Sequence, residues 1–438
     1  MDTPCRLCLT TLYALLLQQT SVPVAAMRLH EVCLVLLFGL VRPSYEQFDP
    51  LRNFCRRWGH QTAVIDNKLY IDGGLVDYGT SVSPTTTNYS NDRLLYNDLG
   101  VITDTFPTQF GNLTKPATVP SVNGGTLWAD TVNKIWYLYG GQYNTAPPDT
   151  FTLWAYDTLY NTWNSSSATS SDGSQVNRVS YGAAAVDDSR GIGYYFGGWL
   201  SNASVSGFGT RSLMTSNLLA YDMNSSTFTN GSGPSTTDAF AEGVMSFIPA
   251  SDGGMLVYFG GIKQPVGGGN GSWTALSMDQ IYLFDLANAK WYVQQATGRV
   301  PESRRRFCGG ATWAQDQSSY NYYLYGGLPA VDQGYGFDDV YILSIPSFTW
   351  IKWYPDDNST GYPHHSLSCN VLSGSQMSIM GGYFTNSSFT DCDVPKIWGQ
   401  HNLNLGEQDV ANAEWYQYLR NVTSYQVPAT IISAVGGG

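Results

Sequence analysis

Short apolar runs that end in a pair of glycines recur along the chain. One such run is residues 136–139 (WYLY), and the others are built from the same aromatic and aliphatic residue types. Such residues suit the pleated surface of a β-strand, and glycine then ends the run, so each run predicts one strand. Successive pairs lie 55 to 67 residues apart, a period typical of a repeat architecture. The pairs are Gly73-Gly74, Gly140-Gly141, Gly197-Gly198, Gly260-Gly261, Gly326-Gly327, Gly381-Gly382 and Gly436-Gly437.

Each repeat contains three further predicted strands. A strand rich in small residues, such as residues 181–186, precedes the apolar run, and turn-forming residues join the two in a hairpin. Downstream, a third strand ends in an aromatic-Asp step and a fourth begins at an aromatic residue seven positions later, as from Tyr156 to Trp163. The repeats therefore predict antiparallel sheets of four strands. The last repeat departs, because Trp415 follows residues 402–405 only after a longer insertion.

This order of elements resembles the kelch repeat. That repeat has a small-residue strand, an apolar strand ending in Gly-Gly, a strand ending in Tyr/Phe-Asp and a strand opened by Trp, and the likeness covers about residues 55 to 437. The resemblance implies an all-β fold, a kelch-type β-propeller with four-stranded antiparallel blades. Residues 55–61 and 398–406 further resemble the secreted kelch ectodomains of filamentous fungi, which are often carried on a membrane or wall anchor.

The number of blades depends on how the ends of the chain are used. Residues 425–437 have the pattern of the first two strands of a seventh unit, and residues 48–54 have a shortened aromatic-Asp-to-aromatic spacing that suits its outer strands. Joining the two ends in this way protects the open edges of a ring of blades. We therefore expect seven blades, with six blades and a frayed C-terminal tail as the alternative.

Residues 1–44 differ in composition from the repeats. They contain two apolar runs, residues 7–17 and 32–41, each too short to cross a bilayer comfortably and each typical of a secretory signal. Met27, before the second run, is an alternative start site. We expect residues 1–44 to be a leader and residues 45–438 to be one propeller domain, secreted or extracellular, with membrane or wall anchoring in a longer form of the protein.

Sequons and cysteines agree with secretion. The chain has ten Asn-x-Ser/Thr sequons and four cysteines outside the leader. N-linked oligosaccharides occur on secreted proteins, and disulfides persist in oxidising compartments. Four cysteines allow three pairings, which all remain open. The cysteines are Cys55, Cys308, Cys369 and Cys392, and the sequon residues are Asn88, Asn112, Asn164, Asn202, Asn224, Asn230, Asn270, Asn358, Asn386 and Asn421.

Charge and motifs narrow the function classes. The chain has 22 basic and 34 acidic residues, a net charge of -12, which argues against a nucleic-acid partner because phosphate binding needs a concentrated basic face. His364 and His365 are adjacent, so on a strand they point to opposite faces and do not both bind one ion. We expect no metal, no cofactor and no catalytic residue. The alternative is a secreted enzyme, either glycan-active or a copper oxidase similar to galactose oxidase. Four residues of this chain faintly resemble the copper-site residues of galactose oxidase: Tyr362, His364, His365 and Cys369.

Charged residues gather just before the first strand of several repeats. That strand lines the central channel of a propeller, so these residues should surround one mouth of the channel. Their forked donors suit acidic or hydroxylated ligands, although they equally suit hydrogen bonds between neighbouring blades. We predict a non-enzymatic recognition module of a fungal cell surface or wall, which binds a protein or carbohydrate at this mouth. The predicted mouth residues are Arg57, Asn123, Arg178, Glu242, Arg306, His364 and His365.

Overall fold

The computed structural model describes most of the chain after the predicted leader. The described residues are 48–79, 88–166, 168–269, 271–331, 334–355, 361–386, 391–406 and 415–436. The predicted leader, residues 1–44, lies outside these ranges, as do Asn270 and Asn358 of the predicted glycosylation sites. Within these ranges, no helix is long and apolar enough to cross a membrane.

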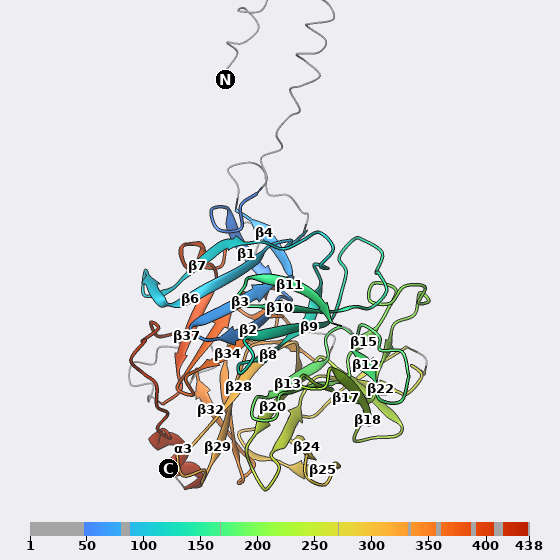
Figure 1. The fold of residues 1–438 in the computed structure, drawn as a ribbon. Coiled ribbons are helices and arrows are strands. Elements are labelled where there is room, and N and C mark those ends of the chain that lie inside the picture. The colour runs from blue at the N-terminus through green and yellow to red at the C-terminus, as the bar shows by residue number, and fades with distance from the viewer. Residues whose placement is uncertain are drawn as a thin grey trace, which may run out of the picture. The chain divides into compact units, whose positions relative to one another are not determined.

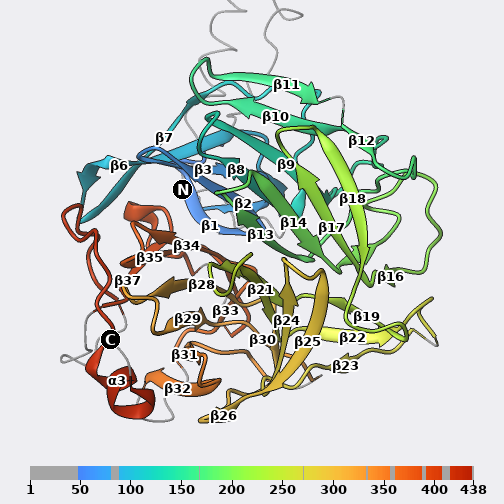
Figure 2. The ribbon, with the colours of Figure 1, turned by 60° about the horizontal axis from the view of Figure 1, so that its bottom comes forward.

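Antiparallel sheets stand side by side around a central channel (Figures 1 and 2). Each predicted apolar run forms the second strand of a sheet, and the small-residue strand before it lines the channel. Blade 1 contains β2 (Gln61–Ile65), β3 (Lys68–Asp72), β6 (Leu94–Thr103) and β7 (Phe106–Leu113). Blade 2 contains β8 (Asn123–Asp130), β9 (Ile135–Gln142), β10 (Leu153–Asp157) and β11 (Thr162–Ser166). Blade 3 contains β13 (Ala183–Asp187), β14 (Ile192–Phe196), β17 (Asn217–Asp222) and β18 (Thr227–Ser232).

The second half of the ring repeats this plan. Blade 4 contains β20 (Val244–Ile248), β21 (Met255–Phe259), β24 (Gln280–Asp285) and β25 (Lys290–Gln295). Blade 5 contains β28 (Cys308–Trp313), β29 (Tyr320–Tyr325), β31 (Val340–Ile345) and β32 (Thr349–Tyr354). Blade 6 contains β34 (Ser368–Leu372), β35 (Gln376–Met380) and β37 (Gln400–Asn404). Two short strands, β12 (Thr169–Ser170) and β26 (Thr297–Gly298), extend blades 3 and 5 by parallel pairing with β18 and β32.

Small accessory sheets position the residues that precede the channel strands. Four of them pair the segment before a channel strand with the segment after the Gly-Gly pair of the same repeat. The accessory sheets were not predicted from the sequence. They are β1 (Phe54–Trp58) with β4 (Leu75–Tyr78) and β5 (Tyr89–Ser90), β15 (Trp199–Leu200) with β16 (Leu213–Met214), β19 (Asp238–Ala241) with β22 (Ile262–Pro265) and β23 (Thr274–Ala275), β27 (Arg304–Arg305) with β30 (Leu328–Pro329), and β33 (His364–His365) with β36 (Tyr383–Phe384). In the third repeat the segment after the Gly-Gly pair forms β15, which pairs with β16, and an isolated bridge joins Trp199 to Ser180 before the channel strand.

The Gly-Gly pairs join each blade to the next. In all six described repeats the second glycine donates its backbone N–H to a carbonyl one repeat further on, at 2.7 to 2.9 Å. The last of these bonds runs from Gly382 back to Arg57, before blade 1. A side chain does not fit there, because Gly382 has φ +117° and an added Cβ would lie 3.0 Å from the Cβ of His364. The recurring Gly-Gly pairs of the sequence are therefore the positions where neighbouring blades are joined.

Ring closure corrects the expected blade number. Leu69 and Ile71 of blade 1 pack against Leu372 and Met380 of blade 6 in one apolar cluster. The channel strand β34 also contacts both β28 and β2, so the channel strands form a closed circle. In the described residues the ring has six blades instead of the preferred seven.

The C-terminal segment is not the start of a seventh blade. Residues 425–437 were expected to form two strands, but the structure has a helix there, α3 (Ala429–Val435), whose Ile431 is fully buried. The preceding segment follows the outer edge of blade 6, where Tyr416 N–H donates to Asn402 O at 2.8 Å. It covers an edge that a fourth strand would otherwise occupy, which protects that edge from pairing with another chain.

Two disulfides select one of the three possible pairings. Cys55 of β1 bonds to Cys392, which precedes the short helix η1 (Pro395–Ile397), and Cys308 of β28 bonds to Cys369 of β34. Residues 48–54 add no strand to a blade; instead, Leu51 O accepts a hydrogen bond of 3.0 Å from Trp398 Nε1, near the first disulfide. The segment before blade 1 is thus tied to the segment of residues 392–398, which precedes the last strand of blade 6. The two disulfides fit a secreted protein.

Candidate functional site at the channel mouth

One residue from each repeat forms a ring of backbone hydrogen bonds where the channel opens. Five of these residues lie two positions before the channel strand of their blade, and Gly124 is the second residue of β8. Each donates its N–H to the carbonyl of the corresponding residue in the preceding blade at 2.7 to 2.9 Å, and the sixth bond closes the circle. We call this set the mouth ring. Its members are Gly59, Gly124, Tyr181, Glu242, Arg306 and Ser366.

All six members of the mouth ring have left-handed backbone conformations. Their φ angles lie between +52° and +68°. The conformation suits the two glycines, but for an L-residue with a side chain it costs roughly 1–2 kcal/mol. Tyr181, Glu242, Arg306 and Ser366 all adopt it. Strain of this kind clusters at functional sites, so the four side chains at the mouth are candidates for function.

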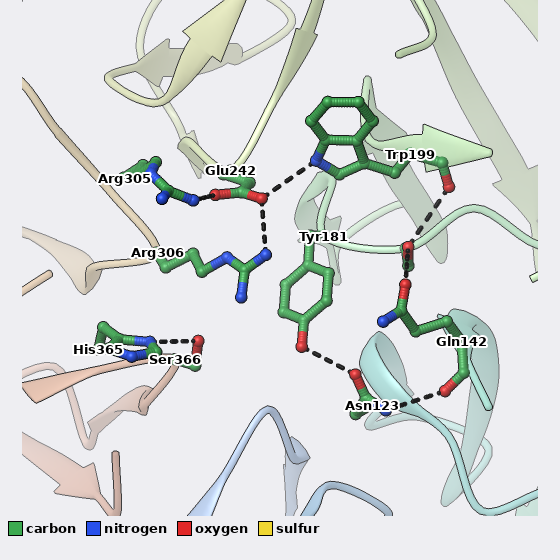
Figure 3. A network of polar contacts seen from close by, with 10 residues as sticks. Asn123, Gln142, Tyr181, Trp199, Glu242, Arg305, Arg306, His365 and Ser366 are labelled. Atoms are coloured by element: carbon green, nitrogen blue, oxygen red, sulfur yellow. Dashed lines mark hydrogen bonds and ion pairs between the residues drawn. The ribbon is translucent and has the colours of Figure 1, made fainter. Parts of the chain in front are cut away.

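Glu242 is the centre of the polar network at this mouth (Figure 3). One carboxylate oxygen accepts a hydrogen bond from Arg305 at 2.7 Å. The other oxygen accepts from Arg306 at 2.8 Å and from Trp199 Nε1 at 3.1 Å. Only 2% of the Glu242 side chain is exposed, and three donors from two segments of the chain hold its carboxylate.

Charge explains why Glu242 stays ionised in a buried position. Burial alone would raise its pKa, but Arg306 and Arg305 outweigh burial and lower the pKa to about 2. The same pairing raises the pKa of Arg306 against the effect of burial. Two guanidiniums face one carboxylate, so one positive charge is left in excess. The Nε atoms of both arginines are buried and have no hydrogen-bond partner among the described residues.

Tyr181 extends the network to blade 2. The guanidinium of Arg306 lies over the Tyr181 ring, 4.2 Å from its centroid, in a cation–π contact. The Tyr181 hydroxyl donates to Asn123 Oδ1 at 2.8 Å, and Asn123 Nδ2 donates to Gln142 O at 3.1 Å. The phenol ring and the guanidinium are therefore held in contact, and Figure 3 shows the two side chains next to each other.

His365 completes the polar side of the mouth. Its Nδ1 lies 2.9 Å from the Ser366 hydroxyl. Burial, followed by the nearby Arg306 and Arg305, lowers its pKa to about 3, so the imidazole is neutral near pH 7. It can exchange hydrogen bonds with a ligand without adding charge.

The mouth ring surrounds a small cavity. Its volume is about 130 Å³, and its lining includes Tyr181, Glu242, Arg306 and Ser366. A second cavity of about 320 Å³ continues along the channel strands and shares His60 and Phe307 with the first. Pockets for drug-sized ligands span roughly 300–1,000 Å³, so the mouth cavity suits one inserted polar group of a larger partner.

The structure brings together only some of the predicted mouth residues. Asn123, Glu242, Arg306 and His365 lie in the network, whereas Arg57, Arg178 and His364 do not. Arg57 is buried and donates to Gln109 Oε1 at 3.0 Å. Arg178 is buried over the Tyr143 ring and donates to Asp149 O at 3.2 Å. These two arginines join elements of the fold, which is the structural role that the sequence analysis left open.

Tyr181 and Trp199 were missed from the sequence. Tyr181 occupies the position of Glu242 and Arg306 in its own repeat, two residues before the observed channel strand, so an alignment of the repeats on that strand would have found it. Trp199 carries no such signal, because its role depends on the accessory sheet that turns its indole toward Glu242.

The residues that resemble galactose oxidase ligands do not assemble. Cys369 is already bonded to Cys308, so it forms no crosslink to a tyrosine. Tyr362 is 72% exposed. These contacts give the copper-oxidase alternative no support.

No family model matches the chain, but known proteins resemble it in sequence and in fold. A kelch repeat-containing protein of Arthroderma benhamiae is 30% identical over 467 residues, which cover 92% of this chain and 68% of that protein. The solved structure of YjhT matches with a TM-score of 0.51 at 13% identity and covers 78% of this chain and 95% of its own. The second likeness shows the fold alone. Both agree with the all-β propeller seen here.

Proposed function

Because the chain belongs to the kelch repeat-containing proteins, we propose that it is a non-enzymatic recognition module that binds its ligand at the mouth ring. A kelch propeller supports a binding role in general, and its specificity depends on local sites on the shared fold. The finer proposal is an extracellular module of a fungal cell surface or wall. The single observation that carries the binding site is the strained Tyr181, Glu242 and Arg306 trio around one cavity.

The ligand group that best suits this mouth is a carboxylate or another small anion on a protein or glycan partner. Glu242 neutralises only one of the two guanidiniums, and 23% and 27% of the side chains of Arg305 and Arg306 remain exposed. A forked guanidinium binds planar anions through paired hydrogen bonds, which a lysine cannot reproduce. The neutral His365 adds a further hydrogen-bonding group beside them.

An extracellular location is supported by two features. The four cysteines of the described chain are all paired, which fits an oxidising compartment. The eight sequon asparagines in the described ranges are all exposed, as glycosylation requires. Glycosylation and secretion remain predictions that mass spectrometry of the secreted protein checks.

The test is a binding screen with matched variants. Labelled protein is applied to arrays of acidic peptides and of anionic and neutral glycans, as wild type, Arg306→Ala, Arg306→Lys and Arg299→Ala. Arg299 is an exposed arginine away from the mouth and serves as the control. Wild type and Arg299→Ala should bind the same anionic probes, whereas both Arg306 variants should lose at least about tenfold in affinity, about 1.4 kcal/mol. Equal binding by Arg306→Ala, or no probe bound by any form, would overturn the proposal.

A further inference from the structure

A cluster of two histidines and one aspartate lies at blade 6 and its accessory sheet, separate from the polar network of the mouth; His364 and Asp393 are buried and His401 is partly buried. His364 belongs to β33, His401 belongs to β37, and Asp393 follows the disulfide residue Cys392. Each offers one ligand atom, and the three atoms all lie within 4.8 Å of one another. The closest pair is His401 Nε2 and Asp393 Oδ1, at 2.9 Å.

Two atoms of this cluster are buried without a hydrogen-bond partner among the described residues. They are His364 Nε2 and Asp393 Oδ2. Buried polar atoms in native proteins are nearly always satisfied, so an imidazole nitrogen and a carboxylate oxygen left unpaired at one place require an explanation. His401 binds Asp393 through the other carboxylate oxygen, so that contact does not satisfy either atom.

Neighbouring groups fix the orientation of His364 and the backbone position of Asp393. The Tyr325 hydroxyl lies 3.3 Å from Nδ1 of His364 and also donates to Asp338, which leaves Nε2 of His364 as the ligand atom. Contacts of this kind orient the histidines of metal sites and set their tautomer. On the other side, the Asp393 N–H donates to Cys55 O at 2.8 Å, so the backbone of the aspartate is fixed beside the disulfide.

We propose that His364 Nε2, His401 Nε2 and the Asp393 carboxylate bind one divalent transition-metal ion of the Zn²⁺ type. Two imidazoles and one carboxylate suit Zn²⁺, whereas Mg²⁺ and Ca²⁺ prefer oxygen ligands alone. In a tetrahedral site with bonds of about 2.0–2.1 Å, neighbouring ligand atoms lie about 3.3 Å apart, so the cluster needs only small side-chain movements to close on an ion. Three protein ligands leave the fourth position to water.

The location indicates a structural role for the ion. It would connect β33, β37 and the segment after Cys392, which are the parts of blade 6 beside the disulfide that closes the ring. From the sequence we expected no metal, because adjacent histidines on a strand point to opposite faces. His365 does face the mouth, but the partners of His364 come from residues 393 and 401, which only the folded blade brings near.

Metal titration of the full chain tests the site. The protein is stripped with a chelator, checked by near-ultraviolet circular dichroism, and titrated with Co²⁺ and Zn²⁺ while visible absorption and metal content are measured. The variants are His364→Gln, His401→Gln and Asp393→Asn, with His365→Gln as the control next to the cluster. Wild type and the control should take up one equivalent with the absorption of tetrahedral Co²⁺. Each ligand variant should lose more than about 100-fold in affinity, beyond the roughly 10–100-fold expected for an outer-shell change such as Tyr325→Phe.

Two results would overturn the proposal. One is a folded wild-type protein that takes up no stoichiometric metal. The other is uptake that persists at wild-type affinity in the ligand variants, which would place the ion elsewhere. Asp393→Asn keeps the shape of the side chain, so it provides a readout if a histidine variant fails to fold. The outcome of the metal titration is independent of the proposed binding function of the mouth ring, because His365 and Arg306 are not among the proposed metal ligands.

Discussion

Replacing Glu242 by glutamine should destabilise the fold in a pH-dependent way. The carboxylate is buried and ion-paired with Arg305 and Arg306, and glutamine keeps its shape but removes its charge. Its pKa falls from 4.5 to about 2 in the folded protein. Each pKa unit is worth about 1.4 kcal/mol, so the ionised carboxylate contributes roughly 3 kcal/mol at pH 7.

The direction of the pH dependence follows from the depressed pKa. A group whose folded pKa lies below its unfolded pKa stabilises the fold above the unfolded pKa, here 4.5, and loses that contribution as the pH falls toward 2. The difference between wild type and Glu242→Gln should therefore shrink from about 3 kcal/mol at pH 7 to about 1.4 kcal/mol at pH 3. At pH 2 the two proteins should be nearly equal.

Denaturant unfolding with intact disulfides, followed by tryptophan fluorescence at several pH values, measures this difference. Glu302→Gln is the matched control, because Glu302 is exposed and its replacement should change stability by less than about 0.5 kcal/mol. A Glu242→Gln penalty that is the same at pH 3 and pH 7 would show that packing, not charge, sets the cost. A penalty below about 1 kcal/mol at pH 7 would refute the pairing.

Three further predictions separate the mouth from the joints of the fold. Arg306→Ala should weaken ligand binding but lower the unfolding free energy by only about 1 kcal/mol, because Arg305 still pairs with Glu242. Arg178→Ala removes a buried side chain that joins elements of the fold and should lower it by about 2–3 kcal/mol. Denaturant unfolding and the binding arrays, applied to both variants, compare the two effects. Gly382→Ala should lower the unfolding free energy by more than about 2 kcal/mol in the same assay, because its φ is +117° and its Cβ would crowd His364. Replacing Cys55 and Cys392 together by serine should cost about 2–4 kcal/mol, since that bond spans 337 residues of sequence, and thiol labelling of the denatured wild type should find none of the four cysteines free.

Local patterns predicted the blades well because each blade is built from neighbouring segments. The alternation around Tyr156 and Trp163 and the runs before the glycine pairs depend only on residues within one repeat. The blade number was wrong because ring closure depends on contacts between blades 1 and 6, far apart in sequence. The strand pattern of residues 425–437 equally suits a helix, and burial of Ile431 against blades 5 and 6 decides between them.

The candidate site was harder to predict because the spacing of residues along the sequence does not determine where their side chains point. Arg178 and Arg306 precede their channel strands in similar ways, yet only Arg306 occupies the ring position and turns toward Glu242. Similarly, nothing in the neighbourhood of His364 in the sequence identifies Asp393 and His401 as its neighbours. These pairings depend on the accessory sheets and on the path of the chain after Cys392.

The joint between the first and last blades has a consequence for how the chain folds as it is made. The disulfide partner of Cys55, Cys392, lies 337 residues later in the chain. At the roughly 5–20 residues per second of protein synthesis, translation of the intervening residues takes about 20 to 70 s. Over that interval the face of blade 1 that carries Leu69 and Ile71 has no partner, because blade 6 does not yet exist. Until blade 6 is made, this apolar face lacks its native partner, so correct folding requires that it not pair with another chain in the meantime.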